Sequence, residues 1–162
     1  MVKRLILGTL LAASALVQSG AQAQRERQPP YWASLAANRA MMRTGPAQTY
    51  PGVWLYVRSD LPVRVVGVQP SWRKVQDPDG ATGWMMVRLL SDTRTALVTG
   101  EEPRPIHDEP DEGARIRYRA EPGVVGRLSR CASGWCRLDV GHRGGFIRTE
   151  HIWGVAPNEE VE

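Results

Sequence analysis

One short unit occurs twice in this chain. The first copy begins Trp72-Arg73-Lys74-Val75, passes a glycine-bearing turn and resumes at Gly83-Trp84-Met85. The second begins Trp135-Cys136-Arg137-Leu138, turns, and resumes at Gly145-Phe146-Ile147 at nearly the same spacing. Each copy has the pattern of a strand opening on tryptophan, a hairpin turn, and a strand opening on glycine and an aromatic residue. This repeat predicts a duplicated β module, which is more often a binding device than an enzyme.

Strand patterns continue on both sides of the two hairpins. A stretch with helical propensity, residues 33–42, lacks an apolar stripe, and we expect only a short extended piece at 40–42. Further strands are expected at 53–57, 61–68, 72–76, 82–87, 95–98, 114–118, 123–129, 135–140 and 144–148, with a closing piece at 151–153. Many short strands at close spacing predict an all-β protein. We place the modules at residues 31–99 and 106–156, with residues 100–105 as the linker.

The N-terminal residues have the pattern of a secretory signal peptide. Lys3 and Arg4 precede an apolar run that is short for a membrane span, and Ala21-Gln22-Ala23 offers a small-x-small cleavage site. We therefore expect residues 1–23 to be removed, residues 24–30 to be disordered and residues 157–162 to form an acidic, solvated tail. The mature protein would be periplasmic or secreted, without a membrane anchor.

The charge of the chain is modest. The formal net charge is +4, and loss of Lys3 and Arg4 would leave +2. Acidic and basic residues are also interspersed along the chain. This balance argues against a nucleic-acid partner.

Two cysteines, Cys131 and Cys136, flank a short Ala-Ser-Gly-Trp segment. In an exported protein such a pair predicts a disulfide across a hairpin, and closing so short a loop should stabilise the fold by about 2 kcal/mol. The alternative is a catalytic thiol with His142 or His151 as its partner.

The residues resemble those of bacterial SH3 (SH3b) domains. The carriers of the resemblance are Arg43-Thr44-Gly45-Pro46 with Tyr50-Pro51, Leu61-Pro62-Val63, the Trp72 and Gly83 segments, Glu121-Pro122-Gly123, and the Trp135 and Gly145 segments. The chain is similar to exported tandem SH3-like proteins of Gram-negative bacteria. The resemblance implies two tandem small barrels of SH3-like type after the signal peptide. We expect no cofactor.

The same resemblance implies one ligand groove per barrel. The groove tryptophan of SH3 domains is present as Trp72 and Trp135. The position of the groove proline is occupied by Met86 in one copy and Arg148 in the other, and that of the groove tyrosine by Leu89 and His151. Loss of the proline and tyrosine argues against binding of proline-rich peptides. The first groove would be apolar and the second partly basic, which favours an acidic peptide for the second.

The other aromatic residues have different expected roles. Trp84 and Phe146 are expected in the cores, and Trp32, Trp54 and Trp153 could cover the seam between the modules. His107 lies near acidic residues, but no second ligand cluster follows at metal spacing, so we expect no metal site.

These observations predict an exported, non-catalytic binding protein that recognises peptidoglycan stem peptide or a periplasmic protein. Two alternatives stay open: a scaffold with no small ligand, and a cell-wall hydrolase that uses a Cys/His pair.

Overall fold

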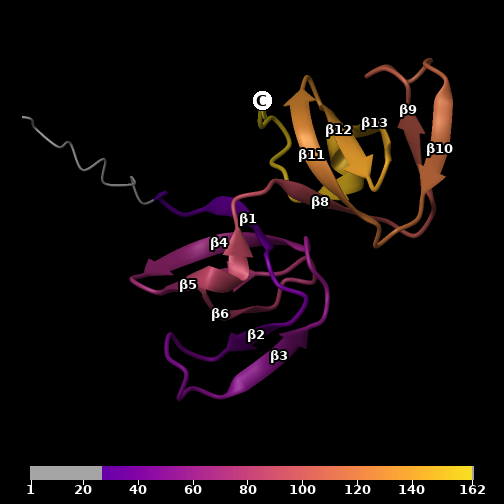
Figure 1. The fold of residues 1–162 in the computed structure, drawn as a ribbon. Helices are drawn as coiled ribbons and strands as arrows, with labels where there is room; N and C mark the ends of the chain where they lie inside the picture. The colour runs from indigo at the N-terminus through magenta and orange to yellow at the C-terminus, as the bar shows by residue number, and fades with distance from the viewer. Residues whose placement is uncertain (1–26, 162) are drawn as a thin grey trace, which may run out of the picture.

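The computed structural model describes residues 27–161. The expected signal peptide, residues 1–23, lies outside the described residues, so its cleavage stays a prediction. The described chain forms two antiparallel seven-stranded sheets that follow one another in sequence (Figure 1). The all-β prediction is confirmed. Within residues 27–161, no helix has the length and apolar character needed to cross a bilayer.

The first sheet has the strand order β3-β2-β6-β5-β4-β1-β7. We call β1–β7 the first module. Its elements are β1 (Tyr31–Leu35), β2 (Ala40–Arg43), β3 (Gly52–Tyr56), β4 (Pro62–Gln69), β5 (Trp72–Gln76), β6 (Thr82–Met86), the 3₁₀ turn η1 (Val87–Leu89) and β7 (Leu90–Ser91).

The second sheet has the order β10-β9-β13-β12-β11-β8-β14, and we call β8–β14 the second module. Its elements are β8 (Thr95–Val98), β9 (Arg104–His107), β10 (Ile116–Ala120), β11 (Val125–Ala132), β12 (Trp135–Val140), β13 (Arg143–Arg148), η2 (Thr149–His151) and β14 (Ile152–Trp153).

The second module repeats the first element by element. Each strand of the second sheet takes the same place in the order as the strand seven positions earlier in the first. The pairing irregularities repeat as well. The β4–β5 and β11–β12 hairpins both shift register partway along, as do the β2–β3 and β9–β10 pairs. Because bulges re-aim strands in a specific way, their repetition indicates duplication of the whole barrel rather than of one hairpin.

The predicted boundary between the modules is wrong for one strand. Residues 95–98 were assigned to the end of the first module, but β8 pairs with β11 and β14 and so belongs to the second sheet. The first module is closed instead by the two-residue β7, which pairs with β1. The predicted linker, residues 100–105, lies between β8 and β9 and ends inside β9. The strand itself was predicted correctly, whereas its sheet depends on pairing partners far away in sequence.

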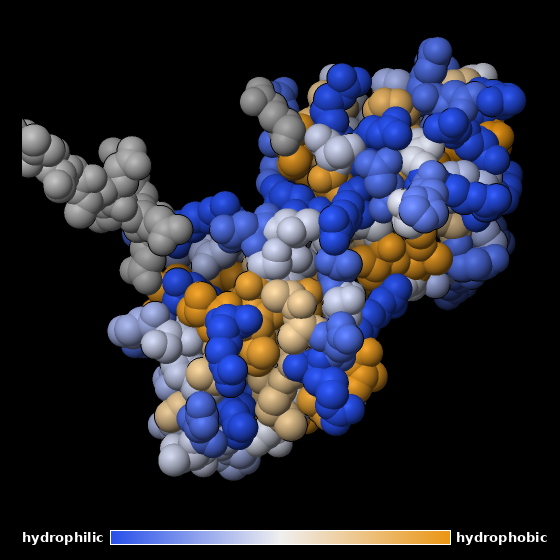
Figure 2. All heavy atoms as spheres, viewed as in Figure 1, coloured by the Kyte–Doolittle hydropathy of each residue, from blue (hydrophilic) through white to orange (hydrophobic). Residues whose placement is uncertain are grey.

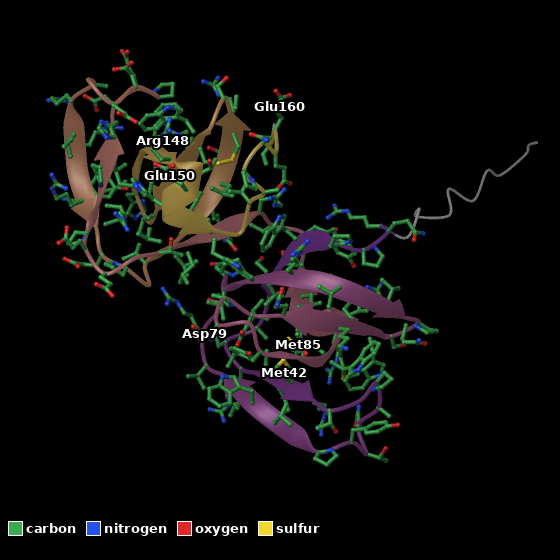
Figure 3. The ribbon with its side chains drawn as sticks, turned by 180° about the vertical axis from the view of Figure 1, so that it is seen from behind. Met42, Asp79, Met85, Arg148, Glu150 and Glu160 are labelled. Atoms are coloured by element: carbon green, nitrogen blue, oxygen red, sulfur yellow. A yellow bond between two sulfur atoms is a disulfide. The ribbon has the colours of Figure 1, made fainter. Side chains whose placement is uncertain are left out.

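Each module has its own apolar core. In the first, Leu35, Val63, Val75 and Met85 are completely buried, and Figure 3 shows Met42 close to Met85. The second core gathers the corresponding strands of its own sheet around residues such as Leu138 and Ile147. Two separate cores mean that each barrel is held together mainly by its own strands.

One glycine per module permits close approach of two strands at the barrel wall. A Cβ on Gly83 would lie 2.5 Å from Cγ of Met42, and a Cβ on Gly145 would lie 2.5 Å from Cγ2 of Ile106. Both distances are far below van der Waals contact. The glycine that opens the second strand of each repeat is therefore required where β6 meets β2 and where β13 meets β9.

The two ends of the described chain are more ordered than expected. Arg27, in the segment expected to be disordered, places Nη1 3.3 Å from a carboxylate oxygen of Asp92. At the other end, the backbone of Val161 forms a two-hydrogen-bond bridge with Cys131. The expectation of a solvated tail is therefore wrong, because the chain end adds an antiparallel bridge to β11.

Candidate functional site

The first predicted groove has little exposed tryptophan. Trp72 is 8% exposed and pairs across the hairpin with Met86 on β6. Met86 is half-buried, and Leu89 packs against the core from η1. Trp72 is therefore largely buried, and ligand contact in this groove stays a prediction.

The second predicted groove is built the same way but is polar. Trp135 is 6% exposed and lies opposite Arg148 in the β12–β13 pair. The Arg148 guanidinium stands over the Trp135 ring at 5.3 Å, and the His107 ring meets it edge-on. The cation and the histidine therefore cover the indole, and ligand contact by Trp135 stays a prediction.

Carboxylates already surround the cation of this groove. Arg148 Nε lies 3.7 Å from carboxylate oxygens of both Glu112 and Glu150, and Figure 3 shows Arg148 beside Glu150. Burial lowers the pKa of His151, and the nearby Arg104 acts in the same direction. A neutral imidazole and a partly neutralised arginine give an acidic peptide less attraction than the sequence predicted.

Alternation of side chains along β6 and β13 keeps the aromatic residue of each strand out of the core. Gly83 and Met85 point inward on β6, so the intervening Trp84 is half-buried rather than in the core. Phe146 occupies the same outward position on β13, with Arg130 above its ring at 6.0 Å. The prediction that these two aromatics form the core is wrong, since alternation gives that role to their neighbours.

The cysteine pair is a disulfide, as predicted. Cys131 and Cys136 are bonded to each other across the β11–β12 hairpin. The chain contains 2 cysteines in all, so neither is left as a thiol nucleophile. The hydrolase alternative is contradicted in this oxidised form, because the nucleophile must be a thiolate.

Among residues 27–161, no three His, Cys, Asp or Glu side chains gather as metal ligands. His107 is buried, and its Nδ1 lies 3.0 Å from the carbonyl oxygen of Ala114. Asp108 is ion-paired with Arg115 and Arg117 at 2.7 and 2.8 Å. The hydrogen bond and these ion pairs fix the loop that contains the acidic residues next to His107.

The seam between the modules is where aromatic residues meet. Trp32 on β1 and Trp153 on β14 pack edge to face with ring centroids 4.7 Å apart. Two predicted seam residues are thus confirmed. The third, Trp54, is 59% exposed on β3 and does not cover the seam. Elsewhere along the seam, Arg58 of the first module donates a hydrogen bond to the Gly123 carbonyl of the second.

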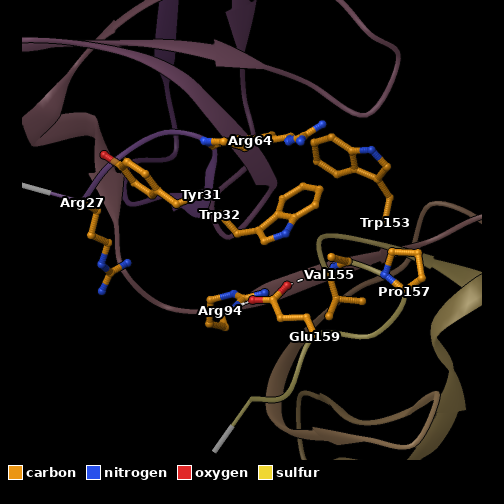
Figure 4. A pocket seen from close by; sticks show the side chains of 11 residues that line it. Arg27, Tyr31, Trp32, Arg64, Arg94, Trp153, Val155, Pro157 and Glu159 are labelled. Carbon is orange, nitrogen blue, oxygen red and sulfur yellow. Dashed lines mark hydrogen bonds and ion pairs between the residues drawn. The ribbon is translucent and has the colours of Figure 1, made fainter.

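A cavity of about 630 Å³ opens at this seam (Figure 4). Its lining residues are Arg27, Pro30, Tyr31, Trp32, Arg64, Arg94, Trp153, Val155, Ala156, Pro157 and Glu159. Both modules and the chain end contribute. Small-ligand sites are mainly apolar with a few convergent polar groups, and this cavity contains both kinds of side chain, in its two indoles and its arginines.

One side of the cavity is held by an ion pair. Arg94 Nη1 donates to Glu159 Oε1 at 2.6 Å, and Arg94 Nη2 donates to the Gly154 carbonyl. Burial alone would raise the pKa of Glu159, but the hydrogen bonds from Arg94 and the Ala156 amide outweigh it and lower the pKa. Glu159 is therefore ionised at neutral pH and neutralises Arg94.

The two remaining arginines of the cavity differ in whether a described acidic side chain already pairs with them. Arg27 is paired with the exposed Asp92. Arg64 comes from β4, is exposed, and lies across the cavity from Arg94 in Figure 4. Because none of the described acidic side chains pairs with Arg64, its guanidinium can receive a carboxylate from a ligand.

Sequence reasoning missed Arg64, Arg94 and Glu159. They lie in no motif, and Arg94 and Glu159 are 65 positions apart. The sequence signal that pointed toward this place was the pair of tryptophans expected at the seam.

Comparisons with known proteins identify the modules. A model of the family described as bacterial SH3 domain matches residues 36–92 and again 100–154. No curated protein matches the chain.

Three solved structures have limited overall similarity to the chain. NlpC2 from Trichomonas vaginalis is 14% identical over 79% of this chain and 49% of that chain, with a TM-score of 0.35. NlpC1 from the same organism is 15% identical over 91% and 50%, also at 0.35. An NlpC/P60 family protein from Bacillus cereus ATCC 10987 is 14% identical over 75% and 55%, at 0.34. The chain spans about half the length of these proteins, and we draw no argument from similarity at this level.

The two family matches have nearly equal length and together cover most of the chain. They fall on the two sheets that repeat one another strand by strand. The chain therefore belongs to the bacterial SH3 domain family, with two copies in tandem.

Proposed function

We propose that the protein is an exported, non-catalytic binding protein that recognises the peptide stems of the cell wall through the cavity at the seam. The family supports the ligand class, since bacterial SH3 domains generally bind peptidoglycan. Export is supported by the N-terminal sequence pattern and by the disulfide, which favours an oxidising compartment such as the periplasm.

The observation that carries the proposal is the composition of the cavity. Trp32 and Trp153 supply flat apolar walls, and Arg64 supplies a cation without a described acidic partner. A stem peptide is short, carries free carboxylates and has small apolar side chains. Its carboxylate would accept charge-assisted hydrogen bonds from Arg64 while its aliphatic groups pack on the indoles.

Co-sedimentation with purified cell-wall sacculi tests the proposal. We expect the wild-type protein to pellet with sacculi and Arg64→Gln to bind about tenfold more weakly, as loss of one charge-assisted hydrogen bond implies. Arg39→Gln is the matched control, because Arg39 is an exposed arginine of the same module outside the cavity. It should bind like the wild type.

Two results would count against the proposal in different ways. Equal binding by Arg64→Gln and the wild type would move the ligand away from the seam, to the predicted grooves around Trp72 or Trp135. No sedimentation of the wild type with sacculi would favour the scaffold alternative, in which a periplasmic protein is the partner. Crosslinking in the periplasm followed by mass spectrometry would then identify that partner.

A further inference from the structure

The edge strand of the first module is uncharged and exposed. β3 ends the first sheet and pairs only with β2 among the described strands. Val53 is 47%, Trp54 59% and Leu55 40% exposed, and the flanking Tyr50 and Val57 are 46% and 68% exposed. Residues 50–57 contain no charged side chain. Figure 2 shows apolar side chains at the margin of this module, toward the C-terminal end of β3.

The duplicated module provides an internal comparison for this strand. β10 ends the second sheet as β3 ends the first, and its pairing with β9 repeats that of β3 with β2, including the irregular step. By this register Val53 corresponds to Arg117 and Leu55 to Arg119. Charged side chains on an edge strand oppose pairing with another chain. The same edge therefore carries two arginines in the second module and no charged side chain in the first. We call an edge strand with such charges guarded and one without them unguarded.

An unguarded edge exposes backbone groups that can pair. Amides and carbonyls on the outer side of β3 have no described partner, since its described pairing is with β2 alone. Strands of this composition, uncharged and rich in β-branched and aromatic residues, pair readily with a further strand.

We propose that β3 is a self-association edge, on which a second copy of this chain pairs its own β3 in antiparallel orientation across a twofold axis. A twofold interface places the same patch on both partners, so each must tolerate its own charges. β3 meets this condition because it has none. The proposal goes beyond the proposed function and does not depend on it.

The exposed area of this strand sets the expected strength of dimerisation. From their exposed fractions, these side chains present roughly 500 Å² per copy, so complete burial of all of them in two copies sets an upper limit of about 1,000 Å². This lies near the lower limit for specific interfaces. We therefore expect a weak, concentration-dependent dimer rather than an obligate one.

Sedimentation-velocity ultracentrifugation over a wide protein concentration range tests the proposal. The wild type should shift from monomer toward dimer as its concentration rises. The double variant Val53→Arg with Leu55→Arg, which copies the β10 pattern onto β3, should stay monomeric throughout. The matched control is Val66→Arg with Val87→Arg, which adds the same two charges at positions 36% and 39% exposed but away from the β3 edge. This control should dimerise like the wild type.

Hydrogen exchange provides a second measurement that needs no variant. The outward amides of β3 should exchange more slowly at high than at low protein concentration, while amides of the guarded strand β10 should not change. A wild type that stays monomeric at every concentration would overturn the proposal, whether or not a foreign peptide binds the strand. Dimerisation of the Val53→Arg, Leu55→Arg variant to the wild-type extent would overturn it as well.

Discussion

The ion pair between Arg94 and Glu159 should be the strongest polar link between the chain end and the seam. Their closest atoms are 2.6 Å apart, and their side chains are only 20% and 26% exposed. Glu159 also accepts a hydrogen bond from the Ala156 amide at 2.9 Å. Charge-assisted hydrogen bonds in partly buried sites contribute more than the small amounts typical of exposed pairs.

We expect Glu159→Gln to lower the free energy of unfolding by about 2 kcal/mol. The amide keeps the shape and one acceptor oxygen but leaves Arg94 as a partly buried cation without a counter-charge. The Nε atom of Arg94 has no described hydrogen-bond partner, so the guanidinium would keep only neutral acceptors such as the Gly154 carbonyl. The control is Glu160→Gln, because Glu160 is the adjacent glutamate and is exposed. Its effect should be near zero.

Urea unfolding at several pH values measures both the size and the sign of this effect. The folded-state pKa of Glu159 lies below its ordinary value, so its contribution is fully present above the pKa of the unfolded chain. It is lost as the pH falls below about 4.5 and through the lower folded-state pKa. The difference between wild type and Glu159→Gln should therefore shrink in acid. Equal stability of Glu159→Gln and Glu160→Gln at pH 7, or a difference that grows in acid, would refute this reasoning.

Three further predictions concern the barrels. Trp135→Ala should lower the free energy of unfolding by about 3–5 kcal/mol in urea titration, because a large buried ring is removed; a loss below about 1 kcal/mol would show that the ring is not packed. Gly83→Ala should cost about 1–3 kcal/mol, since its Cβ would meet Met42 at 2.5 Å, and an unchanged melting temperature would contradict this close approach. Replacing Cys131 and Cys136 together by serine should lower stability by about 2 kcal/mol, and thiol labelling of the unreduced, denatured wild type should find no free thiol.

Local sequence signals predicted most of the strands. Residues 72–76, 95–98 and 135–140 were expected as strands and are β5, β8 and β12 with the same bounds. The turn at residues 77–80 was also predictable, because Pro78 fixes one φ angle and Gly80 can adopt the positive φ that it has in the structure. Asp77 adds hydrogen bonds to the backbone that follows it. In the structure its Oδ1 accepts from the amides of Asp79 and Ala81. These features depend on residues close together in sequence, which is why they could be predicted.

Which side of a strand faces the core was harder to predict. The tryptophans opening each repeat were expected in grooves and are buried, whereas Trp84 and Phe146 were expected in cores and are half-buried. In a strand, a shift of one residue exchanges the two faces. The choice depends on where the neighbouring strand comes close, as β2 does at Gly83.

By itself the sequence determined that this chain is two copies of one small β barrel, because repeated turns, glycines and apolar alternation act locally. Tertiary structure decided which sheet β8 joins, and it brought Arg94 and Glu159 together across 65 positions. It also placed Trp32 against Trp153 and left β3 unguarded while β10 carries arginines. The physical reason is that a seam and a free edge depend on which surfaces meet after folding. Local sequence patterns do not specify contacts between residues that are far apart along the chain.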